Sequence, residues 1–97
     1  MTVDDVAAFV REAAPCRVEP TKVGVVFRNE RRIIGSAKQG RDGVRGHLVL
    51  PRAIAGDARF TKAEPLTSTL WFNGFLLDDP QQLDGSFRAL VVEASVV

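Results

Sequence analysis

Apolar residues recur every three or four positions near both ends of the chain, whereas between the ends they alternate with polar residues. In residues 3–14, Val6 and Val10 follow the helical spacing. Thr2 can cap this helix, and Pro15 ends it because the residue before a proline is pushed out of helical geometry. We therefore predict a helix over residues 3–14.

A second helix is predicted near the C-terminus. Asp79, Pro80 and Gln82 stand in the order of a capping box with proline at the first helical position. The apolar residues that follow at helical spacing are expected to form its buried stripe: Leu83, Phe87, Leu90, Val91 and Ala94. Gly85 lies inside this predicted helix and weakens it by about 1 kcal/mol relative to alanine.

The residues between the helices predict antiparallel strands, because β-branched and alternating segments are separated by polar turns. The expected strands cover residues 16–19, 21–28, 31–38, 44–50 and 66–77. Residues 51–65 are expected to be irregular. The segment 66–77 has two interpretations: one long strand with a bulge at Gly74, which we favour, or a hairpin that turns at Asn73-Gly74.

Turn residues predict how the first strands pair. Asp42-Gly43 is a strong hairpin signal, because both central residues accept positive φ. A two-residue loop there predicts the pairs Ala37 with Leu48, Gly35 with Leu50 and Lys38 with His47. A three-residue loop over residues 29–31 predicts the pairs Phe27 with Ile33, Val23 with Ala37, Arg28 with Arg32 and Lys22 with Lys38. We prefer this register because it separates apolar from charged side chains.

This register sorts the side chains onto two faces. The apolar face is expected to carry Val23, Val25, Phe27, Ile33, Ala37, Leu48 and Leu50. The cationic face is expected to carry Lys22, Arg28, Arg32, Lys38, Arg45 and His47, with Val26 and Ile34 between them. Both helices need an apolar partner, which the first face supplies. We predict a single α+β domain over residues 1–97: an antiparallel sheet of about four to five strands, flanked by an N-terminal and a C-terminal helix packed on one face, in the order α-β-β-β-β-α.

Composition places the chain among ordinary folded proteins. Of its 97 residues, 45% are hydrophobic and 26% are charged, as in typical globular domains. The single cysteine, Cys16, excludes an internal disulfide. No apolar run approaches the roughly 20 residues that cross a bilayer, and the acidic start of the chain is unlike a signal peptide. We expect a cytoplasmic protein that does not contact a membrane.

The formal net charge of +1 hides an uneven distribution. Residues 17–62 contain eleven Lys/Arg against four Asp/Glu, a surplus of seven positive charges. The two flanks together contain two Lys/Arg against eight Asp/Glu, a surplus of six negative charges. Such a separation either leaves a solvated basic sheet beside acidic helices or creates a field that attracts an anionic partner.

Several motifs resemble a known family. They are Arg17-Val18-Glu19-Pro20-Thr21-Lys22, then Val25-Val26-Phe27 and Arg31-Arg32, and later Leu66-Thr67-Ser68 with Phe75, Leu77, Pro80, Leu83 and Asp84. In these the chain resembles the small bacterial domains catalogued as domain of unknown function 5655. The resemblance covers roughly residues 15–94. It implies a compact α+β fold and no established activity.

Candidate catalytic groups are few. His47 is the only histidine, so a site with two histidine ligands is excluded, and we expect no metal or cofactor. We expect neighbouring cations to lower the pKa of His47. Cys16 is expected to be a small buried hydrophobe, and Glu19 is the one carboxylate in the basic segment suited to act as a general base.

Three functional hypotheses follow. The first is a non-enzymatic binding module whose cationic face holds an anionic partner, either a nucleic acid or an acidic protein, although no aromatic residue is expected on that face. The second is a structural domain that dimerises through the strand 66–77, using Trp71, Phe72 and Phe75. The third is a small enzyme that uses His47 or Glu19.

Overall fold

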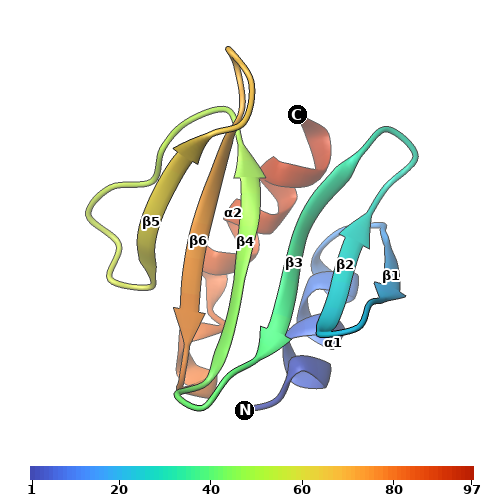
Figure 1. Ribbon diagram of the computed structural model, residues 1–97, viewed down its shortest axis with the longest axis vertical. Coiled ribbons are helices and arrows are strands. Elements are labelled where there is room, and N and C mark those ends of the chain that lie inside the picture. The colour runs from blue at the N-terminus through green and yellow to red at the C-terminus, as the bar shows by residue number, and fades with distance from the viewer.

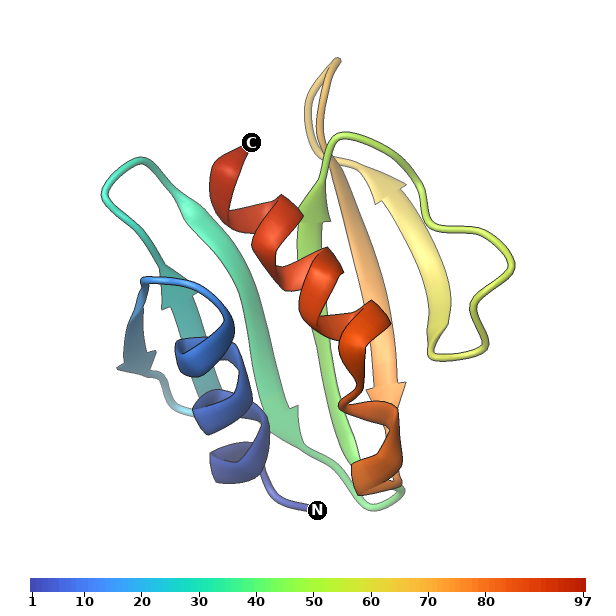
Figure 2. The same ribbon diagram turned by 180° about the vertical axis from the view of Figure 1, so that it is seen from behind.

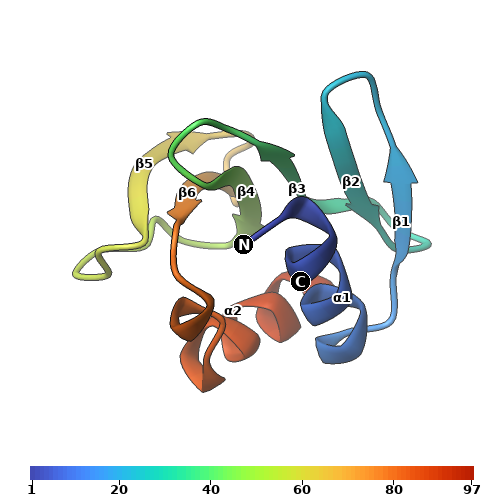
Figure 3. The same cartoon turned by 90° about the horizontal axis from the view of Figure 1, so that it is seen from below.

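The fold has two layers, with one antiparallel sheet on one side and both helices on the other (Figures 1 to 3). The computed structural model describes residues 1–97. In chain order the elements are α1 (Val3–Ala13), β1 (Arg17–Pro20), β2 (Gly24–Arg28), β3 (Ile33–Gln39), β4 (Val44–Leu50), β5 (Phe60–Pro65), β6 (Trp71–Leu77), the 3₁₀ turn η1 (Pro80–Gln82) and α2 (Gly85–Val96). The predicted α+β class with a helix at each end is confirmed, but the sheet has six strands instead of four to five.

The helix α1 begins with the expected cap. The Thr2 hydroxyl accepts a hydrogen bond from the Asp5 amide at 3.3 Å, and the Asp5 carboxylate accepts one from the Thr2 amide at 2.8 Å. This reciprocal pair satisfies two amides that have no partner within the helix. Val6 and Val10 are fully buried, as the spacing predicts.

The helix α2 begins later than predicted. Asp79 and Gln82 do form the capping box, but it encloses only the single turn η1. Asp84 then caps α2 by accepting a hydrogen bond from the Phe87 amide at 2.9 Å. Gly85 is therefore the first residue of the helix and not an interior weakness.

The order of strands in the sheet is β1-β2-β3-β4-β6-β5. β5 falls in the segment that was predicted to be irregular, and residues 66–70 are the turn that joins it to β6. β6 passes through Asn73 and Gly74 without turning, so the alternative hairpin there is wrong. The irregularity lies on β5, between Phe60 and Lys62.

The hairpin between β3 and β4 has a wider turn than predicted. Gln39 pairs with Val44, which leaves the four residues 40–43 as the loop. The pairs are Gly35 with Leu48 and Lys38 with Arg45, two residues from the predicted register. A shift of two residues keeps every side chain on its face, so the predicted sorting of this pair of strands survives.

The pairing of β2 with β3 departs further from the prediction. Val25 pairs with Ala37, and a bulge near the turn pairs Arg28 with Ile33. The bulge reverses the expected roles of two isoleucines: Ile34 is fully buried, whereas Ile33 is 36% exposed. Val23 precedes β2 and is 71% exposed, so it does not belong to the apolar face.

A buried arginine fastens the loop before β5 to the start of α2. Arg59 is 9% exposed and forms ion pairs with Asp57 at 2.7 Å and with Asp84 at 2.8 Å. It also donates to the Ser86 hydroxyl at 2.7 Å, and its guanidinium lies 5.4 Å from the centre of the Phe87 ring. With its donors satisfied in this way, the buried charge is compensated, and it fixes the position of β5.

Candidate functional site

The sheet face opposite the helices is open (Figures 1 and 3). One row of directly paired residues crosses all six strands on this face: Glu19, Val26, Ser36, His47, Gly74 and Lys62. Neighbouring strands are about 4.8 Å apart, so Glu19 and His47, which are separated by three strand spacings, lie roughly 14 Å apart. The two candidate enzyme groups therefore do not form a common site.

A hollow of about 510 Å³ lies on one side of this row and is called the cationic hollow below. Its charged lining residues are Lys38, Arg45 and Lys62. Lys38 and Arg45 are directly paired across neighbouring strands. Arg45 lies 3.4 Å from Asp42 and Lys62 lies 2.7 Å from Glu64, but all four side chains are about half exposed or more, so both ion pairs contribute little. The hollow is thus ringed by positive charge that is compensated only by these exposed pairs.

A second hollow of about 510 Å³ lies on the other side of the row and is called the apolar hollow below. The apolar residues that line it are Val26, Ile33, Val49, Leu66 and Phe72. Arg28 and Arg32 also contribute to its lining. The two hollows share Val26, Ser36 and His47, so they adjoin at the central row of the sheet.

His47 stands where the two hollows meet. Its Nδ1 and the Ser36 hydroxyl are 2.9 Å apart, and either atom can donate the hydrogen bond. Its ring packs edge-on against Phe72, with 4.6 Å between the ring centres. Burial lowers the pKa of His47, so the imidazole is neutral at pH 7. The expected direction of this shift is correct, but its cause is burial and not the neighbouring cations.

The structure brings together three of the six residues predicted to bind an anion. Lys38, Arg45 and His47 share the open face and line the cationic hollow. Arg28 lies on the same face beside the apolar hollow, where its Nε is 3.0 Å from the Glu19 carboxylate.

The other two predicted residues, Lys22 and Arg32, are placed differently. Lys22 lies in the bend before β2, so it pairs with no residue of β3. Arg32 donates to the carbonyl oxygens of Ala94 at 3.1 Å and Val97 at 3.4 Å. These acceptors lie at the C-terminal end of α2, where orphan carbonyls attract a cation. The predicted pairs Arg28 with Arg32 and Lys22 with Lys38 are therefore wrong.

The proposed dimer contacts are also separated by the structure. β6 is hydrogen-bonded to β4 on one side and to β5 on the other, so it has no free edge for pairing with a second copy. Phe75 is 3% exposed and belongs to the core. Trp71 lies on the helix side opposite Leu50, whereas Phe72 lies on the open face opposite Val49. An edge-to-edge dimer through β6 therefore does not fit the strand order, and dimerisation itself stays a prediction.

Three residues of this face were not anticipated by the sequence analysis: Ser36, Lys62 and the ring of Phe72. The alternation of β3 contains the signal for Ser36, because it stands two residues before Lys38. Lys62 was missed because the irregularity in β5 breaks the alternation of its segment. The expectation that no aromatic residue lies on this face is wrong for Phe72.

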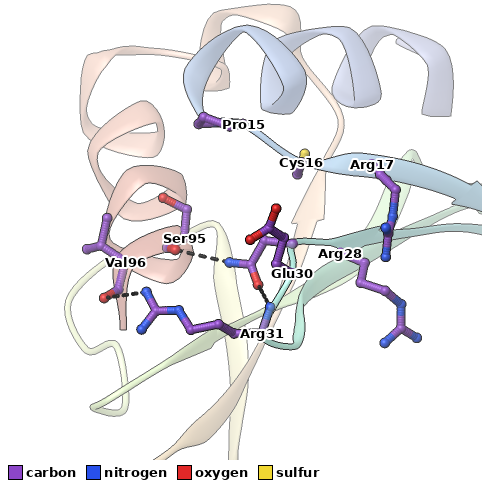
Figure 4. Close-up of a pocket in the computed structure, with 9 residues that line it drawn as sticks. Pro15, Cys16, Arg17, Arg28, Glu30, Arg31, Ser95 and Val96 are labelled. Atoms are coloured by element: carbon purple, nitrogen blue, oxygen red, sulfur yellow. Dashed lines mark hydrogen bonds between the residues drawn. The ribbon is translucent and has the colours of Figure 1, made fainter.

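A further hollow of about 580 Å³ lies where the link from α1 to β1, the turn after β2 and the end of α2 meet (Figure 4). Cys16, Arg28, Arg31 and Val96 are among its lining residues. Arg31 donates to the Val96 carbonyl oxygen at 3.4 Å. Burial raises the pKa of the Cys16 thiol, which makes it a poor nucleophile at neutral pH. Cys16 packs against the core on the helix side, whereas His47 faces the open side, so the two do not form a catalytic pair.

Comparisons of the chain with protein-family models, with curated proteins and with solved structures find no match. The resemblance to domain of unknown function 5655 therefore stays a prediction. None of the helices is both long and apolar enough to cross a membrane. No three His, Cys, Asp or Glu side chains are gathered as a potential metal site.

Proposed function

We propose that this protein is a non-enzymatic binding module that holds an anionic partner, a nucleic acid or an acidic protein, on the open face of its sheet. The observation that carries the proposal is the direct pairing of Lys38 with Arg45 inside the cationic hollow. Like charges opposite each other destabilise a sheet by a few tenths of a kcal/mol or more. A phosphate or carboxylate bound between them would replace this repulsion with two favourable contacts.

The arrangement of charge over the two layers supports the same proposal. Residues 3–14 and 78–97, which include both helices, carry seven Asp/Glu against two Arg. The open face carries Lys38, Arg45 and Lys62 around one hollow. An anion that approaches the molecule is therefore repelled from the helix layer and attracted to the sheet.

The Ser36–His47 pair is the arrangement on this face most similar to an enzyme site. A serine nucleophile needs its histidine to be oriented by a third group, commonly a carboxylate. The only hydrogen bond of the His47 ring is the one to Ser36, and Glu19 lies three strands away. We therefore assign the pair to the binding surface, where it offers neutral hydrogen-bonding groups. A cytoplasmic location is part of this proposal, as the free thiol of Cys16 fits a reducing compartment.

The test compares two variants with the same change in net charge. Lys38→Gln/Arg45→Gln removes the paired cations of the hollow, whereas Arg11→Gln/Arg88→Gln removes two exposed cations from the helices. The probe is inorganic polyphosphate, and its affinity is measured by calorimetry at 50 and 200 mM salt. With three contacts that each release about 0.7 of a counterion, the affinity of the wild type should fall on the order of 20-fold over this range.

We expect the hollow variant to bind polyphosphate at least about tenfold more weakly than the wild type at 50 mM salt, because about 1.4 kcal/mol or more of charge-assisted contact is lost. The helix variant should bind like the wild type. Equal affinity of the two variants would contradict the proposal, since binding would then depend only on net charge.

A further inference from the structure

We infer that the partner on the open face is a single-stranded nucleic acid, with one base against Phe72 and phosphates over Lys38 and Arg45. This inference rests on the proposed function and narrows it to one class of ligand. It comes from the side-by-side placement of an apolar hollow containing an aromatic ring and a hollow ringed by cations. A nucleotide carries the same two chemistries, a flat ring and a phosphate, joined by a sugar.

The apolar hollow offers an aromatic ring, Phe72, against which a base can stack. Phe72 and His47 form adjoining rings, and Val49 and the partly exposed Ile33 and Leu66 complete the apolar lining. Because burial lowers its pKa, His47 adds no charge to this lining, whose charged members are Arg28 and Arg32. A base that stacks on an aromatic side chain adds to the affinity, whichever base it is.

The distance between the apolar hollow and the cationic hollow fits a nucleic-acid strand better than a compact anion. Phe72 and Leu76 are four residues apart on β6, and Arg45 pairs with Leu76. At about 3.4 Å per residue, the backbone positions of Phe72 and of the row that contains Arg45 are therefore roughly 14 Å apart. One phosphate ion cannot touch both positions, whereas a strand of a few nucleotides can.

The Ser36–His47 pair lies between the ring of Phe72 and the cations of the cationic hollow. Its hydroxyl and imidazole supply hydrogen-bonding groups at the point where the sugar or base edge would lie. A double helix would hide its bases in the stack, so only a strand with accessible bases can use the apolar hollow. An acidic peptide would use the cations but has no general need for the ring of Phe72.

The test separates bases from phosphates with two ligands of equal charge. One is an oligothymidylate of eight nucleotides, and the other is the same backbone with an abasic site at every position. Both carry a fluorescent label, and binding is followed by anisotropy. We expect the wild type to bind oligothymidylate about fivefold or more tightly than the abasic strand, because one stacked base contributes at least about 1 kcal/mol.

Two matched variants locate this preference. Phe72→Leu keeps an apolar side chain but removes the ring, and it should bind both strands with the affinity that the wild type has for the abasic strand. Phe9→Leu makes the same change on α1 in the other layer, and it should keep the full preference. The fluorescence of Trp71, the only tryptophan, checks that each variant is folded. The comparison of ligands on the wild type stands even if a variant fails to fold.

The outcomes distinguish this inference from the proposed function. The inference of a single-stranded nucleic acid would be overturned if the abasic and thymidylate strands bind equally. It would also be overturned if a DNA duplex, thymidine monophosphate or polyglutamate binds more tightly than oligothymidylate. In those cases a loss of affinity in Lys38→Gln/Arg45→Gln would still support an anion-binding face. If that double variant binds polyphosphate like the wild type, the proposed function fails first.

Discussion

Gly74 offers a way to fill the cationic hollow without disturbing the fold. It lies in the central row between His47 on β4 and Lys62 on β5, and it lines the hollow. A Cβ atom at this position would lie 3.7 Å from the nearest atoms of Lys62 and 3.9 Å from the Gly46 carbonyl oxygen, which are ordinary contacts. Its φ is not positive, so a branched residue can adopt the same backbone conformation. Gly74→Val therefore places three carbon atoms over the floor of the hollow.

The expected changes in stability and in polyphosphate affinity follow from this geometry. Glycine inside a strand costs about 0.5–1 kcal/mol relative to alanine, and valine is favoured in strands. We expect Gly74→Val to leave the free energy of unfolding unchanged or to raise it by up to about 1 kcal/mol. Its affinity for polyphosphate should fall on the order of tenfold, which corresponds to the loss of about one charge-assisted hydrogen bond.

The assay combines calorimetry with urea unfolding followed by the fluorescence of Trp71. Gly85→Ala is the matched control, because Gly85 begins α2 and a Cβ atom there meets nothing within 4 Å. The control should be at least as stable as the wild type and should bind polyphosphate with unchanged affinity. A folded Gly74→Val protein that binds as tightly as the wild type would refute the placement of the ligand over the central row.

Two further predictions concern the arginine that fastens β5. Arg59→Met should lower the free energy of unfolding by about 2–4 kcal/mol, because it leaves partly buried acceptors without their donor. The measurement is unfolding in urea, and a loss below about 0.5 kcal/mol would show that the contacts of Arg59 do not stabilise the fold. Hydrogen bonds from Arg59 hold the pKa of Asp57 below its usual value, and the Phe87 amide and Arg59 do the same for Asp84. This stabilisation is present above the ordinary carboxyl pKa of about 3.9 and is lost as the pH falls through the lower folded values. The urea midpoint of the wild type should therefore drop between pH 5 and pH 2, and the midpoint of Arg59→Met should drop less. An equal drop in both proteins would contradict the assignment of the lowered pKa values to Arg59.

The sequence predicts the first helix and one strand well, because their signals are local. The cap of Thr2 and the stop at Pro15 bracket α1, and β4 has the predicted limits of 44–50. The capping box at Asp79 is also real, but a local signal cannot tell whether a capped turn continues into a helix. Here it ends after η1, because Asp84 starts a second cap.

The register could be predicted only to within two residues. The signal at Asp42-Gly43 marks a turn, but the loop contains four residues. Gly43 has a φ of 146°, and a Cβ atom at this position would come too close to the Leu77 carbonyl oxygen. That approach depends on β6, which is distant in the sequence. Because the error is an even number, Lys38 and His47 still share a face, as predicted.

The remaining errors arise from contacts made by the whole fold. The bulge that buries Ile34 and exposes Ile33 depends on how β2 and β3 pack on the helices. Arg32 turns to the end of α2, which the sequence cannot place next to β3. Phe72 was assigned to a dimer contact because nothing local shows that β5 covers the edge of β6.

The most direct test of the binding face is a map of the amides that respond to a ligand. Uniformly ¹⁵N-labelled protein is titrated with oligothymidylate and, separately, with polyphosphate, and the shifts of the backbone amide resonances are followed. We expect the changes to concentrate on Ser36–Lys38, Arg45–His47, Lys62 and Phe72–Leu76, with α1 and α2 almost unaffected. Changes centred on the helices or on the hollow around Cys16, or no change with either ligand at millimolar concentration, would contradict the account.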